Sequence, residues 1–425
     1  MKSLEILESK ITGTINIVAS KSLSHRYVIA GSLARGESRI VNVLESKDLE
    51  ATITILKIFG VRIRKENNTY YIDGTNFQIP KDILYANESG STLRFLIPIA
   101  WLFDEEVVFD GKASLGIRPL TVYEQIAHDF GYQLVKKDNS FPITTKGPLR
   151  SGEYVVDGSI SSQFFSGLLF ALPLVKGDSI IVIKGGLSSK GYVDLTLDVL
   201  KEAGIVIEKN DNVFTIKGNQ TYQPLTKEIE GDYSQAAFFI VAAIITNREL
   251  TIKGLNKNSK QGDREILTII NKIGVDYCWD KNDDLVIKRW IKTKDTVIDL
   301  NDIPDLGPVL MVLSSVINNE TKFLNVHRLK IKESNRLDAM LKNLEKLNVK
   351  YQLVGNELII NGGIKLDKKV IFETYNDHRI AMALSVLGLI ADKGIIINDY
   401  EVINKSYPSF YQDLERIGGK IKYDK

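Results

Sequence analysis

The chain has 425 residues, which is too long for one ordinary hydrophobic core, so two or three domains are expected. Hydrophobic residues make up 44% and charged residues 25%, as in a typical globular protein, and a net charge of +2 gives no reason to expect a nucleic-acid or membrane partner. The single cysteine, Cys278, excludes an internal disulfide, and one cysteine with four histidines does not favour a zinc site.

The first residues contain no long apolar run of the secretory type, and no segment reaches the roughly 18 apolar residues of a membrane span. We expect a cytoplasmic protein, and we expect no metal ion and no other cofactor.

The segment 20–26 carries three serines, the cations Lys21 and Arg26 and no acid, and an apolar run follows at 27–33. Serine is a common N-cap residue, so this pattern predicts the start of a helix. Free backbone N–H groups and the helix dipole favour an anion there, and Ser22 and Arg26 share one helix face. The two cations therefore require either an acid from elsewhere in the chain or an anionic ligand, and both alternatives remain open.

Farther along the chain, amphipathic helical patterns end at glycine or asparagine, usually just before a short strand pattern. These ends lie 70–74 residues apart, at Gly60, Gly131, Gly204, Gly274, Asn348 and Gly418. Glycine and asparagine are the residues that a left-handed helix C-cap requires. The regular spacing predicts an internal repeat.

A second series of helical patterns runs in phase with the first. Each has a polar start and is apolar nearly all round, so these helices should be buried. They are expected at 27–33, 95–103, 164–174, 236–245, 306–316 and 380–390. The repeating unit is therefore β-α-β-α-β-β, six times over, in an α/β protein whose buried helix N-termini can converge on an anionic ligand.

Polar residues cluster at the starts of these helices, although each has a simpler reading. Arg118 before a proline is also typical of a surface charge, Asp305 of an N-cap, and Glu333 of a salt-bridge set with Lys332 and Arg336. In chain order the candidates are Lys21, Ser22, Arg26, Gly90, Arg118, Ser161, Ser162, Gln163, Ser189, Tyr192, Asp305, Lys332, Glu333, Arg336, Arg379 and Lys405. Their seven cations outnumber two acids and cannot be buried without anions, which predicts one or two anionic substrates.

The same residues resemble, in chain order, the motifs of the 5-enolpyruvylshikimate-3-phosphate synthase family over essentially the whole chain. The matching stretches are Ser20-Lys21-Ser22-x-Ser24-x-Arg26, Ser89-Gly90-Ser91-Thr92-x-Arg94, Arg118-Pro119, Ser161-Ser162-Gln163, Ile303-Pro304-Asp305, Lys332-Glu333-Ser334-x-Arg336, Asp377-His378-Arg379 and Lys405. The resemblance implies a two-domain inside-out α/β barrel with three of the six repeats in each domain. It also implies that residues 20–229 form a domain that binds mainly shikimate 3-phosphate. Residues 1–19 and 230–425 would form the other domain, with the active site in the cleft between them.

The activity that the resemblance implies is transfer of the enolpyruvyl group of phosphoenolpyruvate to the 5-hydroxyl of shikimate 3-phosphate, with release of phosphate. This step belongs to the shikimate pathway, which leads to chorismate and the aromatic amino acids. The residues carried over as catalytic are Lys21, Asp305 and Glu333. Those carried over for shikimate 3-phosphate are Lys21, Ser22, Arg26, Ser161, Ser162, Gln163, Ser189, Tyr192, Asp305 and Lys332, and those for phosphoenolpyruvate are Lys21, Gly90, Arg118, Gln163, Arg336, Arg379 and Lys405. We expect a monomer that also binds glyphosate, a mimic of phosphoenolpyruvate.

The chain departs from the family pattern at Glu88, where many members have asparagine beside the phosphoenolpyruvate site. A bare carboxylate there would repel the substrate, so we expect Glu88 to be paired with a cation or turned away. The sister family, UDP-N-acetylglucosamine enolpyruvyl transferase, usually has a cysteine in the loop before Arg118-Pro119, and residues 111–116 contain none. A non-catalytic repeat protein that binds a polyanion is a third reading, but it gives no reason for Asp305 and Glu333 among the cations.

Overall fold

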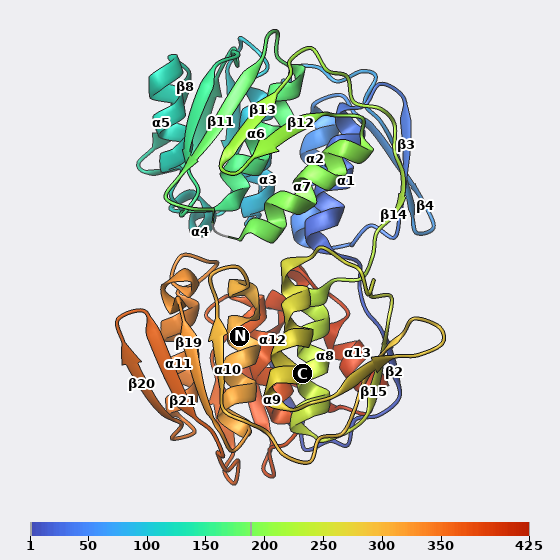
Figure 1. The fold of residues 1–425 in the computed structure, drawn as a ribbon, viewed down its shortest axis with the longest axis vertical. Coiled ribbons are helices and arrows are strands. Elements are labelled where there is room, and N and C mark those ends of the chain that lie inside the picture. The colour runs from blue at the N-terminus through green and yellow to red at the C-terminus, as the bar shows by residue number, and fades with distance from the viewer. Residues whose placement is uncertain (1, 188, 425) are drawn as a thin grey trace. The chain divides into compact units, whose positions relative to one another are not determined.

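The computed structural model describes residues 2–187 and 189–424. The chain folds into two compact units, which Figure 1 shows with their elements labelled. The continuous unit is Ala19–Ile229, and the discontinuous unit combines Met1–Val18 with Glu230–Lys425.

The continuous unit contains three four-stranded sheets, in the orders β14-β3-β5-β4, β6-β7-β9-β8 and β10-β11-β13-β12. Its strands are β3 (Glu37–Val41), β4 (Arg62–Glu66), β5 (Thr69–Asp73), β6 (Leu84–Tyr85), β7 (Val107–Asp110), β8 (Gln133–Lys137), β9 (Ser140–Lys146), β10 (Glu153–Asp157), β11 (Ser179–Lys184), β12 (Ile207–Asn210), β13 (Val213–Ile216) and β14 (Thr226–Glu228). Its helices are α1 (Lys21–Leu33), α2 (Lys47–Ile58), α3 (Gly90–Ala100), α4 (Ala113–Gly116), α5 (Thr121–Phe130), α6 (Ser162–Ala171), α7 (Lys190–Glu202) and the 3₁₀ helix η1 (Leu172–Leu174).

The discontinuous unit also contains three four-stranded sheets, in the orders β22-β23-β1-β24, β16-β17-β15-β2 and β18-β19-β21-β20. Its strands are β1 (Ser3–Leu7), β2 (Thr14–Asn16), β15 (Leu250–Lys253), β16 (Tyr277–Trp279), β17 (Leu285–Ile287), β18 (Thr296–Asp299), β19 (Glu320–Leu324), β20 (Lys350–Val354), β21 (Glu357–Asn361), β22 (Val370–Phe372), β23 (Ile395–Asn398) and β24 (Lys420–Tyr423). Its helices are α8 (Tyr233–Ile245), α9 (Ile266–Ile273), α10 (Gly307–Val316), α11 (Arg336–Glu345), α12 (His378–Gly388) and α13 (Phe410–Arg416), with 3₁₀ helices η2 (Gly262–Glu265), η3 (Pro304–Leu306), η4 (Val326–Leu329) and η5 (Tyr400–Lys405).

Every sheet has one parallel pair followed by two antiparallel pairs, as in β10/β11, β11/β13 and β13/β12. In five of the six repeats an antiparallel hairpin follows the second helix, whereas the parallel pair requires a crossover connection. In the discontinuous unit the N-terminal strand β1 pairs with β23 and β24, so both ends of the chain belong to one sheet. The α/β class and the repeating unit expected from the sequence are confirmed.

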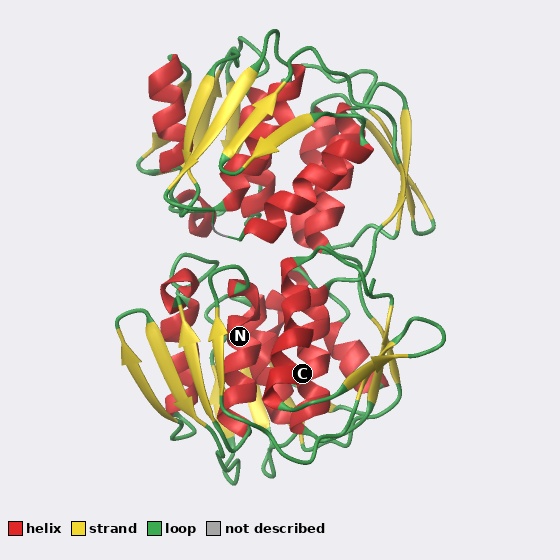
Figure 2. Cartoon of the chain, in the orientation of Figure 1, coloured by secondary structure: helices red, strands yellow, loops and turns green. Residues whose placement is uncertain are grey.

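The six helices that are apolar nearly all round form the interior of the units. Every residue of α8 is buried, and α12 is buried over its whole length. In the discontinuous unit α8, α10 and α12 pack on one another, and Figure 2 shows strands on the outside of these helices. The expected helix 164–174 ends as a short 3₁₀ turn, because Pro173 cannot continue the α-helix.

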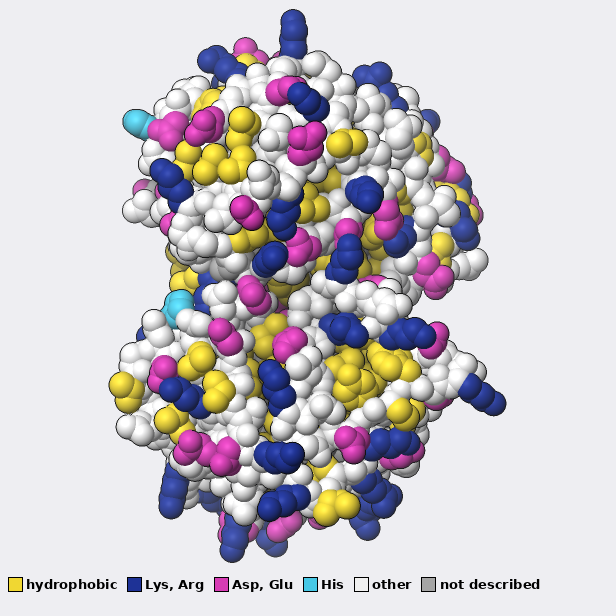
Figure 3. Space-filling view, viewed as in Figure 1, with side chains coloured by type: hydrophobic (Ala, Val, Ile, Leu, Met, Phe, Trp, Pro, Cys, Tyr) yellow, Lys and Arg dark blue, Asp and Glu magenta, His cyan; other side chains and the backbone are white. Residues whose placement is uncertain are grey.

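Basic and acidic side chains are interspersed on the face drawn in Figure 3, with no single basic patch. Among residues 2–187 and 189–424, no helix is long and apolar enough to cross a bilayer. The same residues contain no group of three or more histidine, cysteine or acidic side chains arranged to hold a metal ion.

Candidate active site

The sequence-predicted site residues fall into two groups, one in each unit. We call the group at α1, α3, α6 and α7, together with Arg118 after α4, the serine cluster. The group at the starts of α10, α11 and α12, together with Lys405 of η5, is the carboxylate cluster. The serine cluster comprises Lys21, Ser22, Arg26, Gly90, Arg118, Ser161, Ser162, Gln163, Ser189 and Tyr192. The carboxylate cluster comprises Asp305, Lys332, Glu333, Arg336, Arg379 and Lys405.

Lys21 is the first residue of α1, after the N-cap Ser20, whose hydroxyl accepts from the backbone N–H of Leu23 at 3.4 Å. Its ammonium lies 3.1 Å from Oδ2 of Asp48, an acid of α2 that is 4% exposed. An acid from elsewhere in the chain therefore does partner this cation. Sequence reasoning missed Asp48, although an acid in the first turn after the N-cap Ser46 is a signal of its own.

Arg26 is 2% exposed and joins α1 to α7. Its guanidinium donates to Oγ1 of Thr196 at 2.8 Å, to the carbonyl of Ser22 at 2.8 Å and to the carbonyl of Tyr192 at 2.9 Å. All three acceptors are neutral, so these bonds do not balance its charge. Burial lowers the pKa of Arg26 to about 10, so it remains a cation at neutral pH. A buried cation held by neutral oxygens favours a bound anion.

The N-termini of α3 and α6 bring Gly90, Arg118 and Gln163 together. A Cβ atom on Gly90 would lie 3.2 Å from Nη1 of Arg118 and 3.6 Å from Oε1 of Gln163. Gln163 in turn accepts from Arg94 at 2.8 Å and donates to Ser91 at 2.9 Å. A side chain at position 90 would crowd this group of two guanidinium groups and one amide, and glycine keeps the space open.

The remaining hydroxyls of the serine cluster have local roles as well. Ser161 is the N-cap of α6 and accepts from the backbone N–H of Gln163 at 3.3 Å, and Ser162 follows it. Ser189 precedes α7 with a φ of 56° and is 4% exposed. His25, also on α1, is buried beside Thr52, and burial lowers its pKa to about 3, so it stays neutral.

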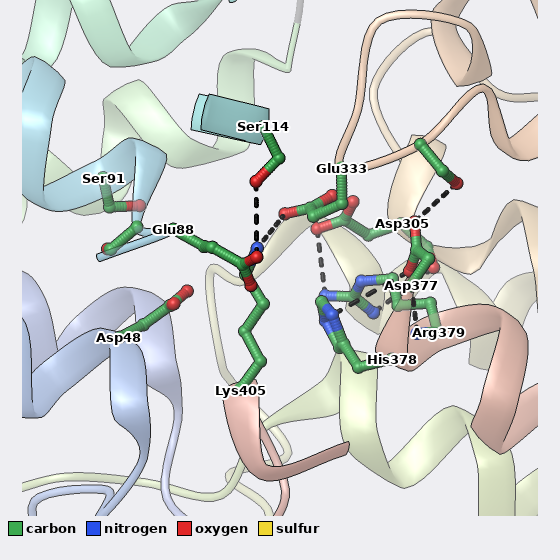
Figure 4. A network of polar contacts seen from close by, with 12 residues as sticks. Asp48, Glu88, Ser91, Ser114, Asp305, Glu333, Asp377, His378, Arg379 and Lys405 are labelled. Atoms are coloured by element: carbon green, nitrogen blue, oxygen red, sulfur yellow. Dashed lines mark hydrogen bonds and ion pairs between the residues drawn. The ribbon is translucent and has the colours of Figure 1, made fainter. Parts of the chain in front are cut away.

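Glu88 is paired with a cation, as expected. Its Oε1 lies 3.5 Å from the ammonium of Lys112 and accepts from the hydroxyl of Ser114 at 3.3 Å. Both partners belong to the segment that leads to Arg118, and Figure 4 shows Glu88 and Ser114 close together.

Arg336, at the first turn of α11, is the centre of the carboxylate cluster and is fully buried. Its guanidinium donates to Asp377 at 2.8 Å, to Asp305 at 2.8 Å and to Glu333 at 2.5 Å. Burial alone would lower the pKa of Arg336, but the three carboxylates outweigh it and raise that pKa. The chain's own acids therefore balance this cation. One of them is Glu333, whose salt bridge with Arg336 was the simpler alternative considered from the sequence.

Asp305 lies in η3, directly before α10, and shares its two oxygens between two guanidinium groups. Arg336 donates to Oδ1 at 2.8 Å and Arg379 to Oδ2 at 3.0 Å. Burial would raise the pKa of Asp305, but Arg379, Lys332 and Arg336 outweigh it and hold that pKa well below its usual range. Asp305 is therefore a carboxylate at neutral pH.

Glu333 also lies near a second cation, with the Lys405 ammonium 4.0 Å from its Oε1. Burial lowers the pKa of Lys332 to about 8, although the nearby Asp305 carboxylate acts in the opposite direction. Asp377 caps α12 by accepting from the backbone N–H of Arg379 at 2.9 Å. Asp305, Glu333, Asp377 and Arg379 lie together in Figure 4. Three acids thus share one guanidinium among further cations, and two of them, Asp305 and Glu333, are placed to transfer protons beside anionic groups.

Comparison with known proteins agrees with this chemistry. Residues 7–414 match the family model of EPSP synthase (3-phosphoshikimate 1-carboxyvinyltransferase). A 3-phosphoshikimate 1-carboxyvinyltransferase of Clostridium novyi is 40% identical over 432 aligned residues, which cover 99% of this chain and 98% of the relative. A relative of the same name from Clostridium kluyveri is 41% identical over 423 residues, with 99% and 98% covered.

Solved structures share the fold at lower identity. An EPSP synthase of Acinetobacter baumannii has a TM-score of 0.83 and 24% identity, with all of both chains covered. The enolpyruvyl transferase NikO from Streptomyces tendae has a TM-score of 0.79 and 15% identity, with 99% of both chains covered. The inside-out α/β fold expected from the sequence is therefore confirmed. The matched model and the full-length relatives together establish that this chain belongs to the EPSP synthase family of transferases.

Proposed function

We propose that this protein transfers the enolpyruvyl group of phosphoenolpyruvate to the 5-hydroxyl of shikimate 3-phosphate and releases phosphate. The observation that carries the proposal is the pair of acids, Asp305 and Glu333, held by the single guanidinium of Arg336. The reaction needs one group to take a proton from the hydroxyl and another to give a proton to the methylene carbon. Two acids in this arrangement meet that need without a metal ion.

Shikimate 3-phosphate is the proposed ligand of the serine cluster. Arg26 supports this assignment, because its three bonds to neutral oxygens leave its charge to be balanced by an anion such as the 3-phosphate. The proposed contacts are Lys21, Ser22, Arg26, Ser161, Ser162, Gln163, Ser189, Tyr192, Asp305 and Lys332.

Phosphoenolpyruvate is the proposed ligand of the cations around Gly90 and in the carboxylate cluster. The open space at Gly90, beside Arg118 and Gln163, suits a small anion with planar carboxylate geometry. The proposed contacts are Lys21, Gly90, Arg118, Gln163, Arg336, Arg379 and Lys405. Lys21 and Asp305 belong to different units, so both units must contribute to one turnover.

In the addition step, the 5-oxygen bonds to C2 of phosphoenolpyruvate while Asp305 takes its proton and Glu333 protonates C3. The product of this step is a tetrahedral adduct. In the elimination step, Glu333 takes a proton back from C3, the double bond re-forms as the bond from C2 to the phosphate oxygen breaks, and the departing phosphate takes up the proton held by Asp305. Lys21 stabilises the departing phosphate, and the cations stabilise charge on the adduct.

The anionic donor also prepares both acids for these roles. Asp305 is held ionised by Arg379, Lys332 and Arg336, and a bound anion competes for the same cations. As those cations turn to the donor, the affinity of Asp305 for a proton rises. The affinity of Glu333 for a proton rises in the same way when Arg336 and Lys405 bind the donor. We also propose that the enzyme works as a cytoplasmic monomer without a nucleic-acid partner.

The test is phosphate release from phosphoenolpyruvate by the purified chain, with shikimate 3-phosphate as acceptor. We expect turnover that requires both substrates, and the carboxyvinyl ether of the acceptor as product. UDP-N-acetylglucosamine serves as the control acceptor and should give no turnover. A folded protein that is inactive with shikimate 3-phosphate, or active with the control acceptor, would contradict the proposal.

A further inference from the structure

Lys112 connects the short helix α4 to the start of α3. Its backbone N–H donates to the carbonyl of Asn87 at 2.9 Å, and its ammonium lies 3.5 Å from Oε1 of Glu88. The same oxygen accepts from the hydroxyl of Ser114 at 3.3 Å. Residues on both sides of the start of α4 therefore hold one carboxylate against this helix, and Figure 4 shows the contact with Ser114.

This carboxylate is close to the proposed donor site. Glu88 lies two residues before Gly90, whose Cβ position is 3.2 Å from Nη1 of Arg118. Ser114 and Arg118 belong to one short stretch of chain, so the bond to Ser114 holds the carboxylate against the segment that carries that guanidinium. A fixed negative charge beside the donor site repels an anionic donor and competes with it for Arg118.

The ammonium of Lys112 opposes both effects. It offsets the charge of Glu88, and it draws the carboxylate toward α4. The Glu88 side chain is 17% exposed, so its charge is less screened by solvent than that of a fully exposed acid. The Lys112 side chain is 54% exposed, so the pair itself contributes little to stability and its removal should leave the fold intact.

We propose that Lys112 is a positioning residue for phosphoenolpyruvate. It acts through Glu88, because its ammonium holds and neutralises that carboxylate beside the segment that carries Arg118. The inference rests on the proposed function for the identity of the donor. It assigns a role in donor affinity to a residue that touches neither substrate, and it accounts for how the chain accommodates an acid at position 88.

The experiment is a double-mutant cycle of Lys112→Met and Glu88→Gln, with KM for each substrate and kcat measured at low and high salt. Lys112→Met should raise KM for phosphoenolpyruvate about three- to tenfold and change kcat and KM for shikimate 3-phosphate less than twofold. The rise should shrink at high salt. In the Glu88→Gln background, where the amide can still accept from Ser114, the same substitution should change KM for phosphoenolpyruvate less than twofold.

Two further variants separate charge from structure. Lys112→Arg keeps the positive charge, so this variant should have the wild-type KM for phosphoenolpyruvate. Lys146→Met is the matched control, because Lys146 lies on β9 in a similarly weak pair with Asp104 at 3.7 Å, and it should change nothing. The proposal would be overturned if Lys112→Met raised KM for phosphoenolpyruvate equally in the wild-type and Glu88→Gln backgrounds, or if it caused no rise in the wild-type background. A fall in melting temperature with an equal rise in KM for both substrates would also overturn the proposal, because that result indicates a purely structural role.

Calorimetric titration of phosphoenolpyruvate in the presence of shikimate 3-phosphate gives a readout that needs no turnover. If the wild-type protein binds the donor without turning over, the proposed function fails while the affinity cycle still tests Lys112. If turnover is normal and the cycle is additive, the role of Lys112 fails and the proposed function stands.

Discussion

Replacing Lys21 by methionine tests the role of this residue in the reaction and in the fold separately. Its ammonium lies 3.1 Å from Asp48, and the two side chains are 15% and 6% exposed. The second oxygen of Asp48, Oδ1, is buried without a hydrogen-bond partner among the described residues. Methionine fills a similar volume but carries no charge, so Lys21→Met leaves the Asp48 carboxylate buried without this cation.

The size of the loss follows from that burial. Removing one partner of a fully buried ion pair costs about 3–5 kcal/mol, whereas exposed pairs contribute about 0–1 kcal/mol. The Lys21–Asp48 pair lies nearer the buried limit, and partial solvent access to Lys21 reduces the cost to about 2–3 kcal/mol. For a unit the size of Ala19–Ile229, each kcal/mol lowers the melting temperature by about 2–4 °C. We therefore expect a loss of about 4–12 °C in the transition of the continuous unit, together with loss of turnover.

The double variant Lys21→Met with Asp48→Asn separates the two effects. An amide at position 48 removes the uncompensated charge, so the double variant should regain most of the thermal stability and remain inactive. Calorimetric melting and phosphate release are the two assays, and Lys47→Met on the exposed side of α2 is the control. A single variant that melts at the wild-type temperature would refute the argument from burial. Turnover in the double variant would refute a catalytic role for Lys21.

Three other variants test the carboxylate cluster and its surroundings. Arg336→Met leaves three carboxylates without their shared guanidinium and should destabilise the discontinuous unit by about 3–5 kcal/mol, as measured by urea unfolding. Burial lowers the pKa of Lys332 to about 8, so KM for shikimate 3-phosphate should rise above pH 8, and Lys332→Arg should remove that rise. Burial, with the nearby Asp305 carboxylate, raises the pKa of Asp263 to about 7, above the value of about 4 in an unfolded chain. Wild-type stability should therefore fall as pH rises from about 4 to about 7, and urea midpoints of Asp263→Asn should show a smaller fall.

The repeat was predictable from the sequence because its cause is local. Helix α5 ends at Gly131 with a φ of 72°, and α9 ends at Gly274 with a φ of 100°. Only glycine, and to a lesser extent asparagine, adopts this left-handed conformation without a steric penalty, so the helix ends are visible as single letters. The buried helices were equally visible, because a helix that is apolar all round can only be packed inside.

The partners of the site residues were not predictable, because they come from distant parts of the chain. Asp48 lies 27 residues from Lys21, and Thr196 lies 170 residues from Arg26. Asp263, which is buried against Ser234, carries no sequence signal that distinguishes it from a surface acid. Residue types and spacing indicated that cations and acids gather at helix starts. Which acid balances which cation depends on packing between repeats, and only the structure shows it.

The acidity of Asp305 links the charge balance of the carboxylate cluster to the timing of proton transfer. Arg379, Lys332 and Arg336 keep the pKa of Asp305 well below its usual range, and a carboxylate so stabilised is a weak base. A bound donor anion competes for these cations, so the pKa of Asp305 must be higher in the complex than in the free protein. The acidic limb of the pH profile should therefore lie at higher pH for kcat, which reports the complex, than for kcat/KM, which reports the free enzyme. Coincident limbs would mean that the donor does not draw on these cations, whereas separated limbs would mean that Asp305 becomes an effective base only when the donor is bound.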